Sequence, residues 1–174
     1  DPNSGDGRFR SVDVVADGAG SAIDFTSLTT FADIYAGSTT NENLDSSLTA
    51  KNGGAVNSPL LQTLNGVNLV LDGTGTLPIA ALKTANFGHL TLSGAGKTYA
   101  FSGLTNLDGN SVLVSGGAVA QFPALTSYTN TTAFNFQTRV LQATGAGSRL
   151  DLQNITSITN GGNYDTHLLV QALA

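Results

Sequence analysis

The stretch HLTLSGAGKTYAFSGLTNLDG, from His89 to Gly109, contains the unit on which the rest of the chain is built. It begins with alternating apolar residues, passes through a Gly-x-Gly corner into a second alternating segment, and ends with a Leu-x-x-Leu motif and a glycine turn. Alternation with a period of two predicts β-strands, and segments this short do not make helices. The unit therefore predicts short strands separated by tight turns.

The unit recurs at least six times between Val12 and Gly161. Each copy has one anchor residue at the start of its Leu-x-x-apolar motif, and the anchors are Leu28, Leu61, Leu82, Leu104, Leu125 and Ile155. The anchors lie 33, 21, 22, 21 and 30 residues apart, so a period of about 21 residues is interrupted twice. Both insertions follow the same point of the unit, at residues 31–46 and 128–138.

These features predict an all-β fold, namely a single-stranded parallel β-helix (β-solenoid) with coils of about 21 residues and two loop insertions. Each coil would hold three short strands, and coils stacked about 4.8 Å apart would pair every strand in parallel with its copies. Leu69, Leu90 and Val112 would then form one ladder inside the core. Because Leu recurs at a spacing of three, a leucine-rich-repeat-like horseshoe is the alternative.

The length and composition of the chain limit how many domains it forms and which partners it binds. The 174 residues suffice for one domain, in which residues 1–10 have the composition of a linker or a remnant of the expression vector and residues 11–174 form the repeat domain. The formal net charge of −5 has the wrong sign for binding nucleic acid. No apolar run approaches the length of a membrane span, so we expect no membrane insertion.

Copies such as LTLSGAGKTYAFSGLTNLDG and LVLDGTGTLP resemble the arrayed β-helical repeats of very large secreted or surface-displayed bacterial proteins. The resemblance is one of repeat texture and extends from Val12 to Ala174. It implies an extracellular or bacterial cell-surface location, with roles in display, adhesion or contact with polysaccharide. The final residues LLVQALA look like the first strand of another repeat, so we expect flanking domains of a longer chain.

The two insertions hold the candidate binding residues, because loops carried at a fixed place on a rigid repeat commonly bind ligands. Aromatic faces stack on sugar rings, while amides and hydroxyls bond sugar hydroxyl groups. The candidate carbohydrate-binding residues are Tyr35, Asn41, Glu42, Asn43, Tyr128, Asn130, Phe134, Asn135, Phe136 and Gln137. The alternative is that these aromatic side chains fold back as a hydrophobic lid over the coil.

The sequence offers no catalytic signature, so we expect no catalytic residues, no metal site and no cofactor. The matching aspartates Asp17 and Asp72 are separated by a copy that carries Lys51, which does not favour a Ca²⁺ cluster. The expected function is a non-catalytic carbohydrate-binding or adhesive module whose partner is a polysaccharide or a cell-surface glycan. A purely structural stalk of a large surface protein is the first alternative, and a polysaccharide lyase or hydrolase is the second.

Overall fold

The structure is a computed structural model, and it describes residues 11–33, 46–132, 135–161 and 163–174. The described residues form an all-β fold in which no residue is helical. Their strands are distributed over five sheets, and every strand pairing is parallel. The predicted all-β class is therefore confirmed.

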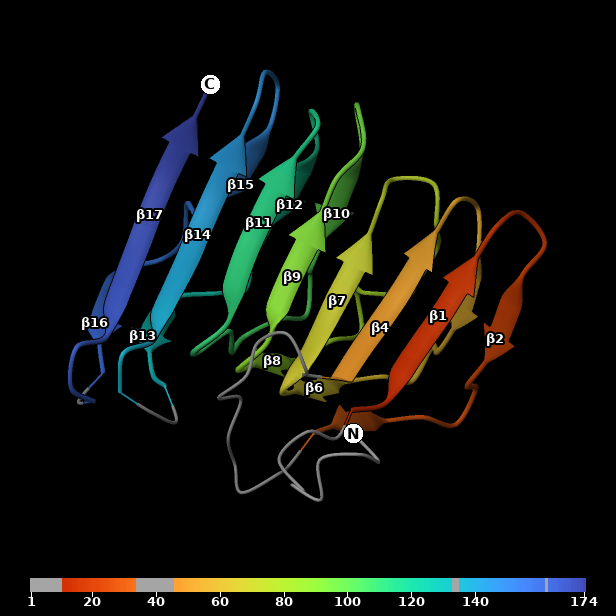
Figure 1. Ribbon diagram of the computed structural model, residues 1–174, viewed down its shortest axis with the longest axis horizontal. Helices are drawn as coiled ribbons and strands as arrows, with labels where there is room; N and C mark the ends of the chain where they lie inside the picture. The colour runs from red at the N-terminus through yellow and green to blue at the C-terminus, as the bar shows by residue number, and fades with distance from the viewer. Residues whose placement is uncertain (1–10, 34–45, 133–134, 162) are drawn as a thin grey trace, which may run out of the picture.

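The largest sheet, which we call the first wall, has seven strands in the order β1-β4-β7-β9-β11-β14-β17. These strands are stacked side by side along the long axis of the molecule, and all of them point the same way across that axis (Figure 1). Their bounds are β1 (Asp13–Asp17), β4 (Ser46–Lys51), β7 (Val67–Leu71), β9 (His89–Leu92), β11 (Ser111–Ser115), β14 (Thr138–Thr144) and β17 (His167–Leu173).

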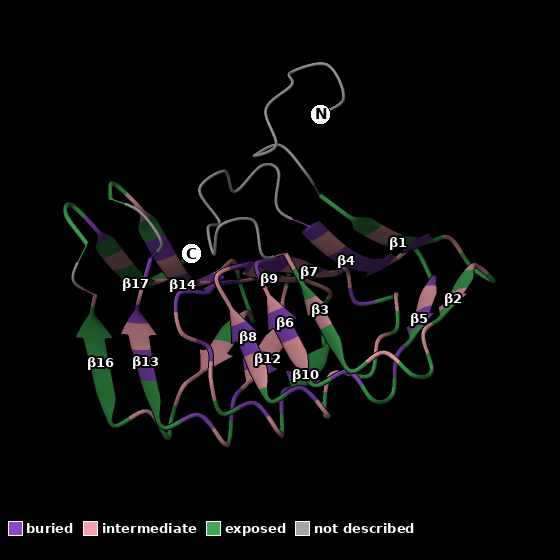
Figure 2. Ribbon diagram, turned by 90° about the horizontal axis from the view of Figure 1, so that it is seen from below, coloured by how far each residue is buried: buried purple, intermediate pink, exposed green. Residues whose placement is uncertain are grey.

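The other four sheets are smaller and lie on two further sides of the core, as Figure 2 shows. The second wall comprises β2 (Ala22–Asp24), β5 (Ala55–Asn57), β10 (Thr98–Ala100), β12 (Val119–Gln121) and β15 (Arg149–Asp151). The third wall comprises β3 (Thr30–Ala32), β6 (Thr63–Asn65), β8 (Thr84–Asn86), β13 (Ser127–Asn130) and β16 (Ser157–Asn160). The chain visits the three walls in rotation, and isolated bridges at Thr76 and Asn106 take the places of two missing strands.

The register of the first wall follows the predicted repeat. Leu69 pairs with Leu90, and Leu90 pairs with Val112, so the predicted ladder is confirmed. Each of these steps covers one basic period, whereas the next two steps, from Val112 to Leu141 and from Leu141 to Val170, are longer. Two longer connections therefore precede β14 and β17, and the second of them was not predicted.

The spacing of three in the Leu-x-x-Leu motif comes from a turn at each anchor. The backbone N–H of Leu61 donates to the carbonyl of Ser58 at 3.1 Å, and Leu82 and Leu104 repeat this three-residue bond. The anchor side chains point inward from these turns and are fully buried. Since no helix alternates with the strands in the described residues, the horseshoe alternative does not fit.

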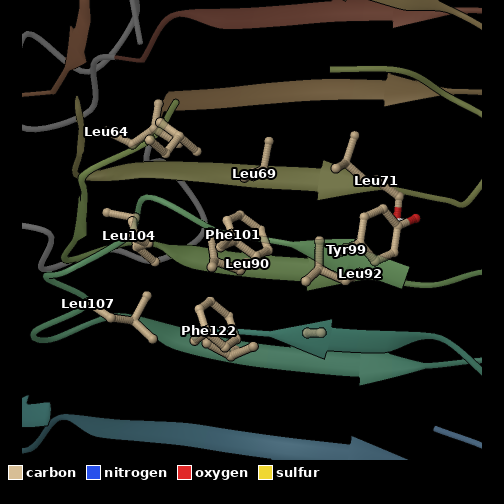
Figure 3. Close-up of a cluster of buried hydrophobic side chains, with 14 of the residues drawn as sticks. Leu64, Leu69, Leu71, Leu90, Leu92, Tyr99, Phe101, Leu104, Leu107 and Phe122 are labelled. Atoms are coloured by element: carbon tan, nitrogen blue, oxygen red, sulfur yellow. Dashed lines mark hydrogen bonds between the residues drawn. The ribbon is translucent and has the colours of Figure 1, made fainter. Parts of the chain in front are cut away.

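The core is one continuous column of apolar side chains enclosed by the three walls. Along β9, for example, Leu90 and Leu92 are buried in the core, while His89 and Thr91 lie on the opposite face of the strand and are half-buried, as alternation requires. Leu64 and Leu104 enter the same cluster from other parts of the coils (Figure 3). Each such leucine contributes about 1.5–3 kcal/mol to the free energy of unfolding.

Aromatic side chains stack within this column in the same way. Phe101 and Phe122 lie with their ring centroids 5.0 Å apart and their planes within 9° of parallel. Figure 3 shows the two rings next to each other. Equivalent residues of successive sequence repeats therefore meet directly, which favours pairing of the repeats in register.

Glycine occupies the corner positions for two separate structural reasons. Gly73 and Gly145 take left-handed backbone angles, with φ of 90° and 84°, which side chains disfavour. Gly75 is needed for space, because a Cβ atom there would overlap the carbonyl oxygen of Ala50 in the preceding coil. The corners thus bring neighbouring backbones close together as well as reversing the chain.

Candidate functional site

The two long connections that precede β14 and β17 lie next to each other at one corner of the molecule (Figure 1). Each leaves the third wall, from β13 or β16, and returns to the first wall. We use the name aromatic corner for a set of exposed or half-buried residues that carry rings or polar groups in these connections and at the first position of β17, namely Asn135, Phe136, Gln137, Tyr164, Asp165 and His167.

Backbone hydrogen bonds hold the two connections together. The N–H of Phe136 donates to the carbonyl of Tyr164 at 3.0 Å, and the N–H of Tyr164 donates to Oδ1 of Asn135 at 2.9 Å. The N–H of His167 donates to the carbonyl of Gln137 at 2.9 Å. These bonds fix the separation of the two backbones, so the aromatic corner is a built feature and not two independent loops.

The two connections also share a backbone shape. Phe136 and Asp165 both take left-handed angles, with φ of 60° and 52°. Thr138 pairs with His167, and the same register continued backwards makes Phe136 equivalent to Asp165. A left-handed residue with a bulky side chain is uncommon, and its occurrence at matching positions shows that the second connection repeats the turn of the first.

The aromatic corner exposes two rings that touch each other. Phe136 is 71% exposed and Tyr164 is 70% exposed. Their centroids are 5.5 Å apart and their planes meet at 83°, an edge-to-face contact. An exposed apolar pair framed by polar groups is a feature of binding surfaces.

Polar groups surround the two rings. His167 Nε2 lies 2.9 Å from Asp165 Oδ1, and Gln137 Oε1 accepts a hydrogen bond of 3.1 Å from the buried Arg139. The hydroxyl of Tyr164 and the side-chain amide nitrogen of Asn135 form no hydrogen bond with the described residues. They are therefore available as donors to a ligand that rests on the rings.

Two of the predicted binding residues are buried, which corrects the expectation that they face a ligand. Tyr128 is 1% exposed, and its hydroxyl donates to the carbonyl of Asn110 at 2.9 Å. Asn130 is fully buried, and its Nδ2 donates to Asn160 Oδ1 at 2.6 Å. Both residues belong to β13, and the alternation of the strand turns these side chains inward.

The electrostatics of Tyr128 agree with a structural role. Burial raises the pKa of its phenol well above the usual value, the nearby Arg139 works in the opposite direction, and Asp108 adds to the rise. Tyr128 is therefore a neutral core residue at physiological pH. It matches the alternative in which an aromatic side chain of the insertion packs back onto the coil.

The remaining predicted residues divide into two groups. Asn135, Phe136 and Gln137 come together at the aromatic corner. Five predicted residues lie outside the described ranges, namely Tyr35, Asn41, Glu42, Asn43 and Phe134.

The second half of the aromatic corner, which contains Tyr164, Asp165 and His167, was not predicted from the sequence. The repeat copies are recognisable by their anchor residues, and no anchor follows Ile155 to reveal the third insertion. A signal was nevertheless present, because VLQA at Val140–Ala143 reappears as LVQA at Leu169–Ala172. The offset between these two copies is longer than the basic period and marks an extra connection.

The matching aspartates at the Gly-x-Gly corners have a structural role. Asp17 lies 3.3 Å from Lys51 Nζ and accepts a hydrogen bond from Asn52 Nδ2 at 2.8 Å. Asp72 accepts hydrogen bonds from the backbone N–H groups of Asn52, Thr74 and Gly75. Desolvation opposes the ionisation of Asp72, but these three donors together outweigh it, so its pKa lies well below the usual value.

Within the described ranges, no cluster of His, Cys, Asp and Glu has the makings of a metal site. The same residues include no helix of the length and hydropathy that a membrane crossing needs. Comparison of the chain with protein-family models, with curated proteins and with solved structures finds no match.

Proposed function

We propose that the chain is a segment of a single-stranded parallel β-helix whose coils keep the basic period of the sequence repeat. Support comes from the rotation of the chain through three walls and from the parallel pairing of each strand with its copy one coil later. Where paired residues of consecutive first-wall strands lie more than one basic period apart in the sequence, the extra residues lie at the corner between the third and first walls. The three walls of the coil therefore keep their size. Such a rod displays its insertions along one line.

We further propose that this segment is a non-catalytic carbohydrate-binding or adhesive module of an extracellular bacterial surface protein. The observation that carries the proposal is the exposed, edge-to-face pair of Phe136 and Tyr164. Sugar rings present flat C–H faces that pack on aromatic rings, and their hydroxyl groups need donors and acceptors at the rim. Asn135 and the Tyr164 hydroxyl supply such groups beside the rings.

A purely structural stalk is the second candidate, and a different observation favours it. The first wall continues without interruption through seven strands, and β17 pairs with β14 along its full length. An array of this kind extends by adding coils, as a spacer requires.

The deciding experiment is a binding assay of the purified chain against cellulose, chitin, xylan and pectin. We expect retention on one polymer, and we expect Phe136→Ala and Tyr164→Ala each to weaken it by about tenfold. Leu60→Ala is the matched control, because Leu60 is also exposed, at 51%, but lies outside the aromatic corner. Absence of binding to every polymer would favour the stalk, and shortening of a polymer would favour the enzyme.

A further inference from the structure

We infer that the aromatic corner binds a single, solvated, electrically neutral glycan chain and not the flat face of an insoluble polymer. This inference rests on the proposed carbohydrate-binding function and specifies its ligand. It follows from two observations, namely the angle between the two rings and the charges around them.

The angle between the rings does not suit a flat surface. The sugar faces exposed on a packed, crystalline polymer lie in one plane, so a protein that stacks two rings on it needs those rings to be coplanar. The planes of Phe136 and Tyr164 meet at 83°, so only one of them can lie flat on such a surface. The second ring would then stand on its edge and hold the first ring away from the polymer surface.

The contact between the two rings favours this angle. The hydrogen bond from the Phe136 N–H to the Tyr164 carbonyl and the bond from the Tyr164 N–H to Asn135 hold the two Cα atoms at a fixed separation. To become coplanar, the rings would have to give up their edge-to-face contact, which is one of the favoured arrangements of an aromatic pair.

An isolated glycan chain fits the two perpendicular rings. Successive sugars in a solvated chain are free to turn about their glycosidic bonds, so one sugar can stack on one ring while a neighbour contacts the other. Because both rings are mostly exposed, each offers area to the ligand. Asn135 and the Tyr164 hydroxyl are placed to bond the hydroxyl groups of the same chain.

The charges around the rings favour a neutral sugar. Binding a carboxylate or sulfate group needs an accessible cation. In the described residues of the two connections and the adjoining starts of β14 and β17, the basic groups are His167, which is exposed but lies 2.9 Å from the Asp165 carboxylate, and Arg139, which is buried and donates to Gln137. The carboxylate of Asp165 and the net charge of −5 would both repel an acidic glycan.

The test compares soluble and insoluble forms of the same sugar. The probes are cellohexaose, chitohexaose and xylohexaose as neutral chains, hexagalacturonate as the acidic chain, and crystalline cellulose and chitin as flat surfaces. We expect calorimetry to detect a neutral hexasaccharide, with binding weakened about tenfold by Tyr164→Ala and by less than about threefold by Tyr164→Phe, which keeps the ring. Thermal unfolding of each variant checks that the fold is intact.

Two outcomes separate this inference from the proposed function. Retention on crystalline cellulose or chitin without binding of the matching hexasaccharide, or a preference for hexagalacturonate, would overturn the inference and leave carbohydrate binding in place. Failure to bind any probe in either form would overturn both.

Discussion

The middle repeats and the last repeat have the same sequence pattern but differ in how far their side chains are buried. Leu69, Leu90, Val112, Leu141 and Val170 form one ladder of the first wall, in register throughout. The first four are fully buried, whereas Val170 is 57% exposed. The third wall shows the same contrast, since Tyr128 is 1% exposed and its partner Ile158 is 50% exposed.

This comparison shows that burial in a stacked array depends on neighbours on both sides. An inward-facing residue in the middle is covered by the coil before it and the coil after it, whereas Val170 and Ile158 are covered on one side only. Stability in such arrays is close to a sum of contributions from each unit and each interface between neighbours. The same type of substitution should therefore have very different effects in the two regions.

The largest expected effect is that of removing a ladder leucine from the middle. Leu90→Ala should lower the free energy of unfolding by about 3–4 kcal/mol, because it leaves a cavity between two coils. Val170→Ala, at the equivalent position of the last coil, should cost less than about 1 kcal/mol. Urea denaturation of both variants measures the difference, and equal losses would contradict the dependence on neighbours.

The next effect concerns the corners. Gly75→Ala should destabilise the chain by about 3 kcal/mol, because its methyl group would overlap the Ala50 carbonyl oxygen of the adjacent coil. Gly145→Ala, near the last coil, has open space around the new methyl group and should cost only about 1 kcal/mol for its left-handed angle. Thermal unfolding would refute this distinction if the order of the two variants were reversed.

A smaller effect is expected from the pair Tyr128 and Ile158. Tyr128→Phe removes the hydrogen bond to the buried carbonyl of Asn110 and should cost about 1–1.5 kcal/mol. Ile158→Val, in register with it on β16, should change stability by less than about 0.5 kcal/mol because that side chain is half exposed. The two variants are compared by denaturant titration, and a larger loss for Ile158→Val would show that the last coil is better covered than its exposure indicates.

The smallest effect is a dependence on pH at the Asp72 corner. Because the folded state holds the pKa of Asp72 well below its ordinary value of 3.8, its ionised form stabilises the fold at neutral pH. This contribution begins to fall below about pH 4 and is fully lost only as the pH falls through the folded-state pKa. Asp72→Asn should therefore be less stable than the parent chain at pH 7, and less stable by a smaller margin at pH 3. A stability difference that is the same at both pH values would exclude the carboxylate as its source.

Much of the fold could be predicted from the sequence because strand pairing copies one residue pattern from coil to coil. The ladder of Leu69, Leu90 and Val112 was visible as a spacing in the chain, whereas the spacing of three at the anchors left a horseshoe open as an alternative. The candidate site was predicted less well. Tyr128 and Phe136 come from the same insertion and have similar chemistry, yet one is in the core and the other is 71% exposed.

Periodicity alone therefore determined the all-β class, the parallel register and the identity of the inward positions, since each of these repeats locally along the chain. Only the tertiary structure decided at which repeat the inward-facing side chains become exposed to solvent. It also decided which residues of the insertions contact each other. Phe136 and Tyr164 are distant in the sequence and touch only because two consecutive coils stack at one corner. That contact depends on backbone hydrogen bonds between coils, which no local sequence pattern encodes.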